Sequence, residues 1–401
     1  MSRRAEAEAA RTPAPDVRPL YAAGFVTAFG AHGVAATWGA ESAGAQLLHL
    51  GLLVAVYDLA EVLLKPVFGA LADRVGPRPV ITGGLLGFAA VSFAGVVWSA
   101  PVAVILVRFG QGAAASAFSP AASAAVARLA SPERRGRAFG RYGSWKSLGY
   151  VGGPILGAAL ALVGGIGLLQ LVLGVLGLAV AVWVLLRCPD VVPLPRRRPT
   201  VLDVLRESAD RRFLGPVVAL AAAAGTLVAA IGFLPAQSAR LQAGVVGAAG
   251  AASVLALALA ITQPLVGRWI DRHPGGTRWL GAASLVLCAA GLLIAAWAPT
   301  LLAVLLGALV IGLGVAGATP SGYSSLAAVT APEHMGRTMG TAEMGRELGD
   351  AAAPALVGAV GAAVGLASGL AALAVLVLAA AGATALISAG ARETSPGAIK
   401  P

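Results

Sequence analysis

The chain has 401 residues, of which 58% are hydrophobic and only 12% are charged. A water-soluble domain carries about 25% charged residues, so this composition excludes a soluble enzyme or binding domain. The net charge of +11 would suit a nucleic-acid-binding protein, but the arginines gather in alternate loops between apolar segments, which indicates membrane topology and no nucleic-acid partner.

Segments of about 20 apolar residues can cross a bilayer as helices, and such segments follow one another along the chain. We therefore predict an all-α polytopic membrane protein with twelve transmembrane helices. The predicted spans lie near residues 19–40, 45–71, 79–98, 101–127, 138–163, 166–187, 213–235, 245–267, 278–297, 299–320, 339–363 and 367–390.

A polar stretch rich in arginine and proline, residues 188–212, separates the sixth predicted span from the seventh. It predicts a cytoplasmic linker between an N-terminal six-helix bundle, residues 19–187, and a C-terminal one, residues 213–390. Cytoplasmic tails are expected at residues 1–18 and 391–401. Because residues 1–18 are polar, no cleavable signal peptide is expected, and the first span should be an uncleaved anchor.

The positive residues predict the orientation. Loops with several arginines alternate with loops that have almost none, and positive loops stay in the cytoplasm, so both termini are predicted to be cytoplasmic. Lysine is almost absent, with only Lys65, Lys146 and Lys400. That bias is typical of a GC-rich bacterial genome, so the expected location is a bacterial cytoplasmic membrane.

The two predicted bundles repeat each other, which makes them pseudo-symmetric. Ser131–Gly140 and Ala331–Gly340 share the pattern P-E-x-x-G-R-x-x-G, and Gly69–Arg74 resembles Gly267–Arg272. Two parallel repeats of six helices suit an alternating-access transporter that holds its substrate at the interface between them.

The loop between the second and third spans resembles the gating-loop signature of the major facilitator superfamily, G-x-L-a-D-R-x-G-R-[RK], with Pro77 in place of one basic residue. The matching residues are Gly69, Asp73, Arg74, Gly76 and Arg78. The resemblance implies that Asp73 caps or pairs with charges at neighbouring helix ends and so locks one conformation, as a carboxylate near helix N-termini does. The alternative is that the arginines serve topology alone.

The fourth span contains Arg108, followed by Gln111 and Gly112, and resembles the R-x-x-q-G pattern of proton-coupled members of the superfamily. An arginine inside a span is energetically costly, so we expect it to face the cavity and find a partner there. The alternative is an arginine that extends to one membrane surface.

The fifth span resembles G-x8-G-x3-G-P-x2-G-G, the signature of the drug:proton antiporter branch, with Ala158 in place of the last glycine. The matching residues are Gly140, Gly149, Gly153, Pro154 and Gly157. The proline is expected to bend the helix, and the glycines permit close helix packing. The motif favours export, although generic glycine packing would also explain the small residues.

Ionisable residues within the predicted spans are expected to line the substrate cavity and to carry proton coupling, because charges inside a membrane are rare and mark transport pathways. They are the acids Asp58, Glu61, Glu343, Glu347 and Asp350, and the bases Lys65, Arg108, Lys146 and Arg346. The acids exceed the bases by one. A carboxylate without a partner in a low dielectric favours its protonated form, which a proton carrier requires; Asp58 and Asp350 lie deepest.

In the fold that the resemblance implies, the second and eleventh spans approach each other across the interface, and depth along these spans then predicts ion pairs between the two halves. Lys65 is expected to pair with Glu343 toward the cytoplasm, and Glu61 with Arg346 deeper in the membrane. Buried lysine can lose its proton whereas arginine cannot, so Lys65 and Lys146 are interpreted as titratable groups or as ligands for an anionic substrate group. The alternative is that three lysines are too few to interpret.

These features predict a secondary active transporter without cofactor, coupled to protons. An exporter (antiporter) of a small polar or amphiphilic molecule, such as a drug or metabolite, is favoured. The alternative is a symporter that imports a sugar, an organic acid or another metabolite; a non-transporting sensor has no soluble domain to support it. The expected partners are the substrate, protons and the lipid bilayer, and the protein is expected to be a monomer.

An enzyme is not expected. Gly312–Gly317 fits G-x-G-x-x-G, but it lies in an apolar span without the strand that a dinucleotide site needs. Cys188 and Cys288 form no C-x-x-C pair, so no metal site is expected.

Overall fold

The computed structural model describes residues 16–40, 47–98, 100–191, 211–242, 244–273 and 276–390. The tails predicted at residues 1–18 and 391–401 therefore lie almost entirely outside the described residues. The same holds for most of the predicted linker, from residue 192 to residue 210.

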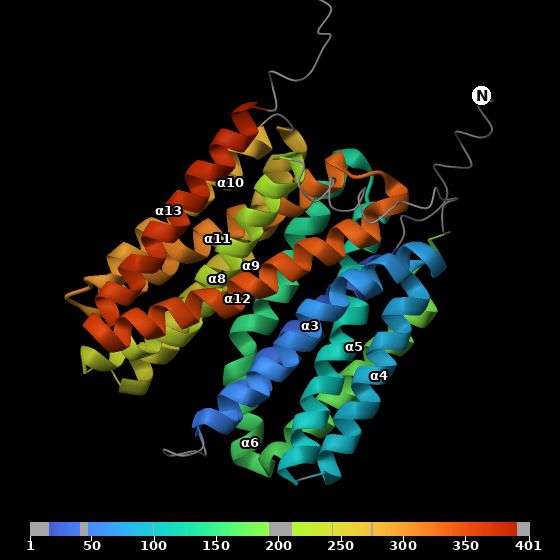
Figure 1. The fold of residues 1–401 in the computed structure, drawn as a ribbon, viewed down its shortest axis with the longest axis horizontal. Helices are drawn as coiled ribbons and strands as arrows, with labels where there is room; N and C mark the ends of the chain where they lie inside the picture. Colours follow the sequence, from blue (N-terminus) through green and yellow to red (C-terminus); the bar gives the residue numbers. More distant parts are fainter. Residues whose placement is uncertain are drawn as a thin grey trace, which may run out of the picture.

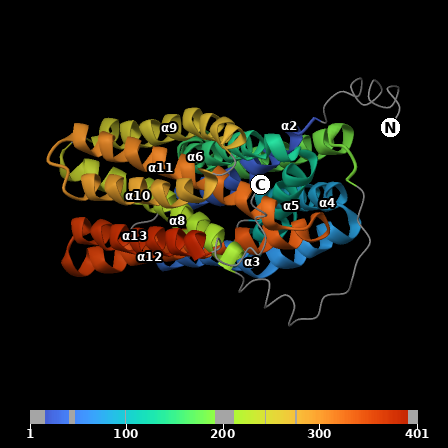
Figure 2. The ribbon, with the colours of Figure 1, turned by 90° about the horizontal axis from the view of Figure 1, so that it is seen from above.

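The described residues form helices and no strand, as the all-α prediction requires. Two bundles lie side by side along the long axis of the molecule, one coloured blue to green and the other yellow to red (Figure 1, Figure 2). The helices of the first bundle are α2 (Arg18–Ala40), α3 (Leu47–Val75), α4 (Pro77–Val97), α5 (Pro101–Leu129) and α6 (Arg135–Arg187). Those of the second are α8 (Arg211–Arg240), α9 (Gly244–Arg272), α10 (Thr277–Ala296), α11 (Leu301–Val329), α12 (Met335–Val364) and α13 (Leu366–Gly390).

Helix α6 contains two predicted spans. It runs for 53 residues, but Gly164 and Gly165 interrupt it with non-helical backbone, and Gly165 has a φ of 68°. Glycine adopts this left-handed region without the steric cost that other residues meet. Within the described residues, nine helices are long and apolar enough to cross a membrane, with α6 counted once. The described helices are compatible with the twelve predicted spans.

Large apolar side chains cover the outside of the molecule. Leu162, Leu302 and Leu386 are 88%, 76% and 76% exposed, whereas Phe88 and Leu285 in the two bundle interiors are fully buried. Exposed leucines of this kind suit contact with lipid, which accepts apolar surface at no cost.

The two bundles touch most closely at the arginine-loop end, the end of the molecule at which Arg74, Arg137 and Arg337 lie. Here α3 crosses α12, and α6 crosses α9. Two glycine pairs allow backbone contact, since a methyl group on Gly69 would overlap the carbonyl oxygen of Gly336, and one on Gly267 would overlap that of Gly136. The structure is therefore closed at this end.

Candidate functional site

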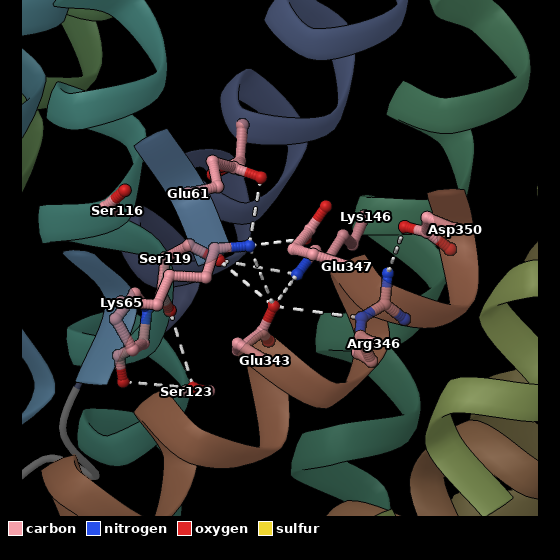
Figure 3. Close-up of polar contacts among 12 residues, drawn as sticks. Glu61, Lys65, Ser116, Ser119, Ser123, Lys146, Glu343, Arg346, Glu347 and Asp350 are labelled. Carbon is pink, nitrogen blue, oxygen red and sulfur yellow. Dashed lines mark hydrogen bonds and ion pairs between the residues drawn. The ribbon is translucent and has the colours of Figure 1, made fainter. Parts of the chain in front are cut away.

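Seven charged side chains gather between the two bundles, where α3, α6 and α12 meet (Figure 3). We call them the interface charge cluster. Its members are Glu61, Lys65, Lys146, Glu343, Arg346, Glu347 and Asp350, and all of them are buried. Charges in this setting are tolerated only when they pair, so the contacts within the cluster hold the two halves together.

Lys65 on α3 forms ion pairs with three carboxylates. Its Nζ lies 3.0 Å from Glu61 Oε2 and 3.7 Å from Glu343 Oε2, and it donates a hydrogen bond to Glu347. The expected pairing with Glu343 is thus present. The pairing expected between Glu61 and Arg346 does not form, because Glu61 contacts Lys65 one turn along its own helix.

Glu343 lies at the centre of the cluster and joins α12 to three other helices besides α3. Its Oε2 accepts from Lys146 Nζ on α6 at 2.6 Å and from Ser119 Oγ on α5 at 3.4 Å. Its Oε1 accepts from the hydroxyl of Tyr323 on α11. Arg346 Nε lies 3.7 Å from the same carboxylate.

Arg346, Tyr150 and Asp350 form a second group deeper in the interface. Arg346 Nη2 donates to the Tyr150 hydroxyl at 2.7 Å, and that hydroxyl donates to Asp350 Oδ2 at 3.0 Å. Arg346 also lies 3.8 Å from Asp350. The ring of His32 on α2 meets the Tyr150 ring edge-on, with 4.4 Å between their centroids.

Some of the carboxylate oxygens remain available. Among the described residues, Glu61 Oε1 and Asp350 Oδ1 are buried without a hydrogen-bond partner. Asp58, half-buried on α3, makes no ion pair within the described part of the chain. Each of these carboxyl groups can accept a proton or a hydrogen bond from a cationic group.

Arg108 lies inside the first bundle, where it is 1% exposed, so it does not extend to a membrane surface. It donates to the carbonyl oxygens of Gly30 and Ala31 on α2, at 3.2 and 3.3 Å, and its guanidinium stacks 4.3 Å above the Tyr57 ring. These contacts join α5 to α2 and lie apart from the interface charge cluster.

The gating loop binds the opposite bundle through Asp73. Its carboxylate accepts from the backbone N–H groups of Gly336 and Arg337, at 2.7 and 2.9 Å, at the start of α12. The geometry is that of a cap on a helix N-terminus. Asp271 at the end of α9 accepts from Arg137 N at the start of α6, at 3.1 Å. The two repeats therefore cap each other.

Of the other gating-loop residues, Gly69 contacts Gly336 on α12, whereas Gly76 and Arg78 make their contacts within the first bundle. Arg78 contacts Asp190 at 2.6 Å and donates to the carbonyl oxygen of Leu185, both at the far end of α6. Arg74 is exposed. Gly76 has a φ of 89°, which glycine adopts readily at the turn between α3 and α4.

The glycines of the fifth-span motif pack α6 against two different helices. A methyl group on Gly157 would overlap the carbonyl oxygen of Gly33 on α2, and Gly149 lies close to Phe25 of the same helix. Gly140 instead faces the backbone of Gln263 on α9, across the boundary between the bundles.

The remaining two motif residues also lie inside α6. Gly153 approaches the backbone of Gly33 on α2. Pro154 lies within the helix, and the non-helical backbone occurs later, at Gly164 and Gly165. The break in α6 therefore follows the paired glycines rather than the proline.

Four site residues were not predicted from the sequence. Ser119, Tyr150 and Tyr323 form hydrogen bonds with the charged side chains. Arg135 Nη1 donates to the carbonyl oxygen of Ala327 across the bundle boundary, at 2.9 Å. The repeat offered one signal, because Tyr150 occupies the position that Asp350 holds in the second half.

A small cavity lies beside the cluster, lined by Lys146, Tyr150, Tyr323, Arg346 and their neighbours from both bundles. Its volume of about 10 Å³ matches a single water molecule. Binding sites for drug-sized molecules measure about 300–1,000 Å³. The bundles must therefore separate before such a molecule can occupy this cavity.

Comparison with known proteins gives a consistent family match. Residues 20–238 and 217–400 both match the family model described as Major Facilitator Superfamily. The chain is 38% identical over 117 residues to the class C tetracycline resistance protein of Escherichia coli, an alignment that covers 29% of each protein. It is 33% identical over 189 residues to multidrug resistance protein MdtH of Cronobacter sakazakii, covering 45% of this chain and 44% of that protein.

Those two alignments span less than half the length of each relative. A solved structure is similar over a longer stretch: the human organic anion transporter MFSD10 (TETRAN) superposes with a TM-score of 0.76 at 21% identity, covering 92% of this chain and 100% of that one. At that identity the likeness concerns the fold.

Proposed function

Because the chain belongs to the major facilitator superfamily, and is thus a multi-pass membrane transporter rather than an enzyme, we propose that it is a proton-coupled exporter. It exchanges protons for a small polar or amphiphilic molecule, such as a drug or metabolite, by alternating access. It acts as a monomer in a bacterial cytoplasmic membrane, with both termini and the arginine-loop end in the cytoplasm.

The observation that carries this proposal is the excess of carboxylates over cations at the interface between the bundles. Glu61 and Asp350 each keep one buried oxygen without a partner among the described residues, and Asp58 adds a further carboxyl group. A proton and a cationic group of the substrate compete for the same acceptors, because binding of either removes the negative charge. Competition of this kind produces exchange: one ligand must leave before the other binds.

Export is supported by the fifth-span motif and by the relatives. The motif glycines pack α6 closely against α2 and α9, in the pattern that resembles the drug:proton antiporter branch. The tetracycline and multidrug resistance proteins to which the chain is similar carry drug-resistance names.

A proton symporter that carries an organic acid is the second candidate. Lys146 and Arg346 line the interface cavity, and an anionic substrate group that takes their contacts displaces Glu343. The displaced carboxylate then favours its protonated form, so anion and proton bind together. The name of MFSD10, an organic anion transporter with a similar fold, is a further reason to consider this candidate.

Growth inhibition separates the candidates. Cells that express the protein are compared with cells that express Asp350→Asn at equal level, against a panel that contains tetracycline, cationic dyes and organic acids. Export predicts that the wild-type protein raises the tolerated concentration of at least one cationic or zwitterionic compound. If it instead sensitises cells to toxic organic acids, the import candidate replaces export.

A further inference from the structure

The two crossings between the bundles have the same geometry. In the first, between α3 and α12, Gly69 contacts Gly336 and Asp73 caps α12. In the second, between α9 and α6, Gly267 contacts Gly136 and Asp271 caps α6. The sequence repeat relates the helices of one crossing to those of the other, so each position has a counterpart.

The side chains at equivalent positions differ in charge. The first crossing holds the quartet Glu61, Lys65, Glu343 and Glu347, and the repeat places the quartet Leu259, Gln263, Gly143 and Ser147 at the corresponding positions of the second. Lys65 and Gln263 both directly precede a proline in their helices, which fixes the register. One quartet is fully ionisable and the other is fully neutral.

The same contact is made twice with different chemistry. In the first crossing Lys65 binds Glu347; in the second, Gln263 Nε2 donates to Ser147 Oγ at 3.0 Å. A glycine packs against the backbone carbonyl oxygen of each of these two residues: Gly340 against Lys65 and Gly140 against Gln263. A proton can neutralise a carboxylate in the first contact, but the second contains no group that titrates at ordinary pH.

The charged groups around each crossing support this distinction. Lys65 faces Glu61 on its own helix and Glu343 and Glu347 on α12; Glu343 in turn binds Lys146 on α6 and Tyr323 on α11. Around Gln263 and Ser147, the adjacent Lys146 points to Glu343. Each crossing has one capping carboxylate, Asp73 at the first and Asp271 at the second, so a capping carboxylate does not distinguish the two crossings.

We propose that the two crossings have different tasks: the α3–α12 crossing opens and closes in response to protons, whereas the α6–α9 crossing, held by Gln263 and Ser147, moves without any change in protonation. Gln263 and Ser147 are then positioning residues, which set the balance between states equally at every pH. The inference rests on the proton coupling proposed above and assigns it to one of two equivalent contacts.

Spin labels at the exposed Val75 and Val329, at the arginine-loop ends of α3 and α11, report the separation of the bundles. Distances are measured in lipid nanodiscs at a series of pH values. The wild-type distance distribution is expected to change with pH. The variant Glu61→Leu/Lys65→Gln/Glu347→Ser copies three positions of the neutral quartet and keeps Glu343 as the partner of Lys146. Its distance distribution should change with pH much less than that of the wild type, because only Asp58 and Asp350 remain of the proposed proton acceptors.

Ser147→Ala is the matched variant at the neutral crossing. It should change the ratio of closed to open populations by the same factor at every pH. If the triple variant folds poorly, Gln263→Lys/Ser147→Glu provides an independent test, because a second charged crossing should make the pH response steeper.

The outcomes are distinguishable. A triple variant that keeps the wild-type pH response, a Ser147→Ala variant whose effect on the closed-to-open ratio varies with pH, or a Gln263→Lys/Ser147→Glu variant with an unchanged slope overturns the assignment alone. A wild-type protein whose distances do not depend on pH overturns the proposed proton coupling itself.

Discussion

Glu343 is the residue on which the interface charge cluster most depends. Lys146, Lys65 and Arg346 all lie within ion-pair distance of its Oε2. Breaking a buried ion pair by removing one partner costs about 3–5 kcal/mol, because the remaining charge is left uncompensated in a low dielectric. The same carboxylate links α12 to α3, α5, α6 and α11, so its loss affects every helix that contributes a charged side chain to the cluster.

We therefore expect Glu343→Gln to lower the melting temperature of the purified protein by several degrees and to abolish transport. Glu133→Gln, at an exposed position before α6, is the control and should melt like the wild type. Adding Lys146→Met to Glu343→Gln removes one stranded cation and should recover part of the stability. Equal melting temperatures for Glu343→Gln and Glu133→Gln would contradict the central role of Glu343.

Exchanging the charges of Lys65 and Glu347 is a poor test of their pairing. Lys65 forms ion pairs with three carboxylates. A glutamate at position 65 would therefore be repelled by the negative charges of Glu61 and Glu343. Neutralising both residues, alone and together, avoids this repulsion and isolates their coupling energy.

At the scale of elements, the arginine-loop end closes through glycine contacts. Gly69→Val should prevent the approach of α12, because even a methyl group there overlaps the carbonyl oxygen of Gly336. We expect the variant to favour the state that is open at the arginine-loop end. Gly83→Val on α4 is the matched control, since nothing lies within 4 Å of the position its Cβ would take.

The opening is measured by the reactivity of a cysteine placed at Ser324, which is 7% exposed and lines a pocket between the bundles together with Arg135 of the first bundle and Asp271 of the second. The native cysteines give little background: both are buried, and burial raises the pKa of the Cys188 thiol to about 11. Labelling should be faster in Gly69→Val than in Gly83→Val; equal rates would exclude a steric role for Gly69.

The two helix caps make a second prediction at this scale. Removing a capping carboxylate costs about 0.5–2 kcal/mol, which corresponds to a 2- to 30-fold change in the balance between closed and open states. Asp73→Ala and Asp271→Ala should both increase labelling of the same cysteine, because each caps a helix of the opposite bundle. Slower labelling in either variant would show that its cap does not stabilise the closed state.

The sequence predicted the helices and the interface residues better than their contacts. Charges stand out in apolar spans, and the fold implied by the resemblance brings the second and eleventh spans together, so Lys65 and Glu343 were predicted to meet. The resemblance to the gating-loop signature marked Asp73. Depth along a helix does not define the direction of a side chain, which is why Glu61 was assigned to Arg346 when its own helix offers Lys65 one turn away. Uncharged partners such as Tyr150 carry no such signal, because tyrosine is common in membrane helices.

At the scale of the whole molecule, the structure combines a closed arginine-loop end with a charged interface, and the cavity beside the interface charge cluster has room for about one water molecule. A transporter must open this interface to each side in turn. The capping carboxylates and glycine pairs explain how the closed end holds. The carboxylates that have an oxygen without a partner among the described residues are the groups at which we propose that protons change that balance.

Proton flux in inverted membrane vesicles tests the central claim of proton-coupled exchange most directly. The compound that the growth panel identifies is added outside vesicles with an acidic lumen, and a pH-sensitive dye reports the lumen. Exchange predicts that the lumen becomes less acidic only when the compound is present, and that Asp350→Asn gives no change. Compound uptake without proton release, or protons that move in the same direction as the compound, would contradict it.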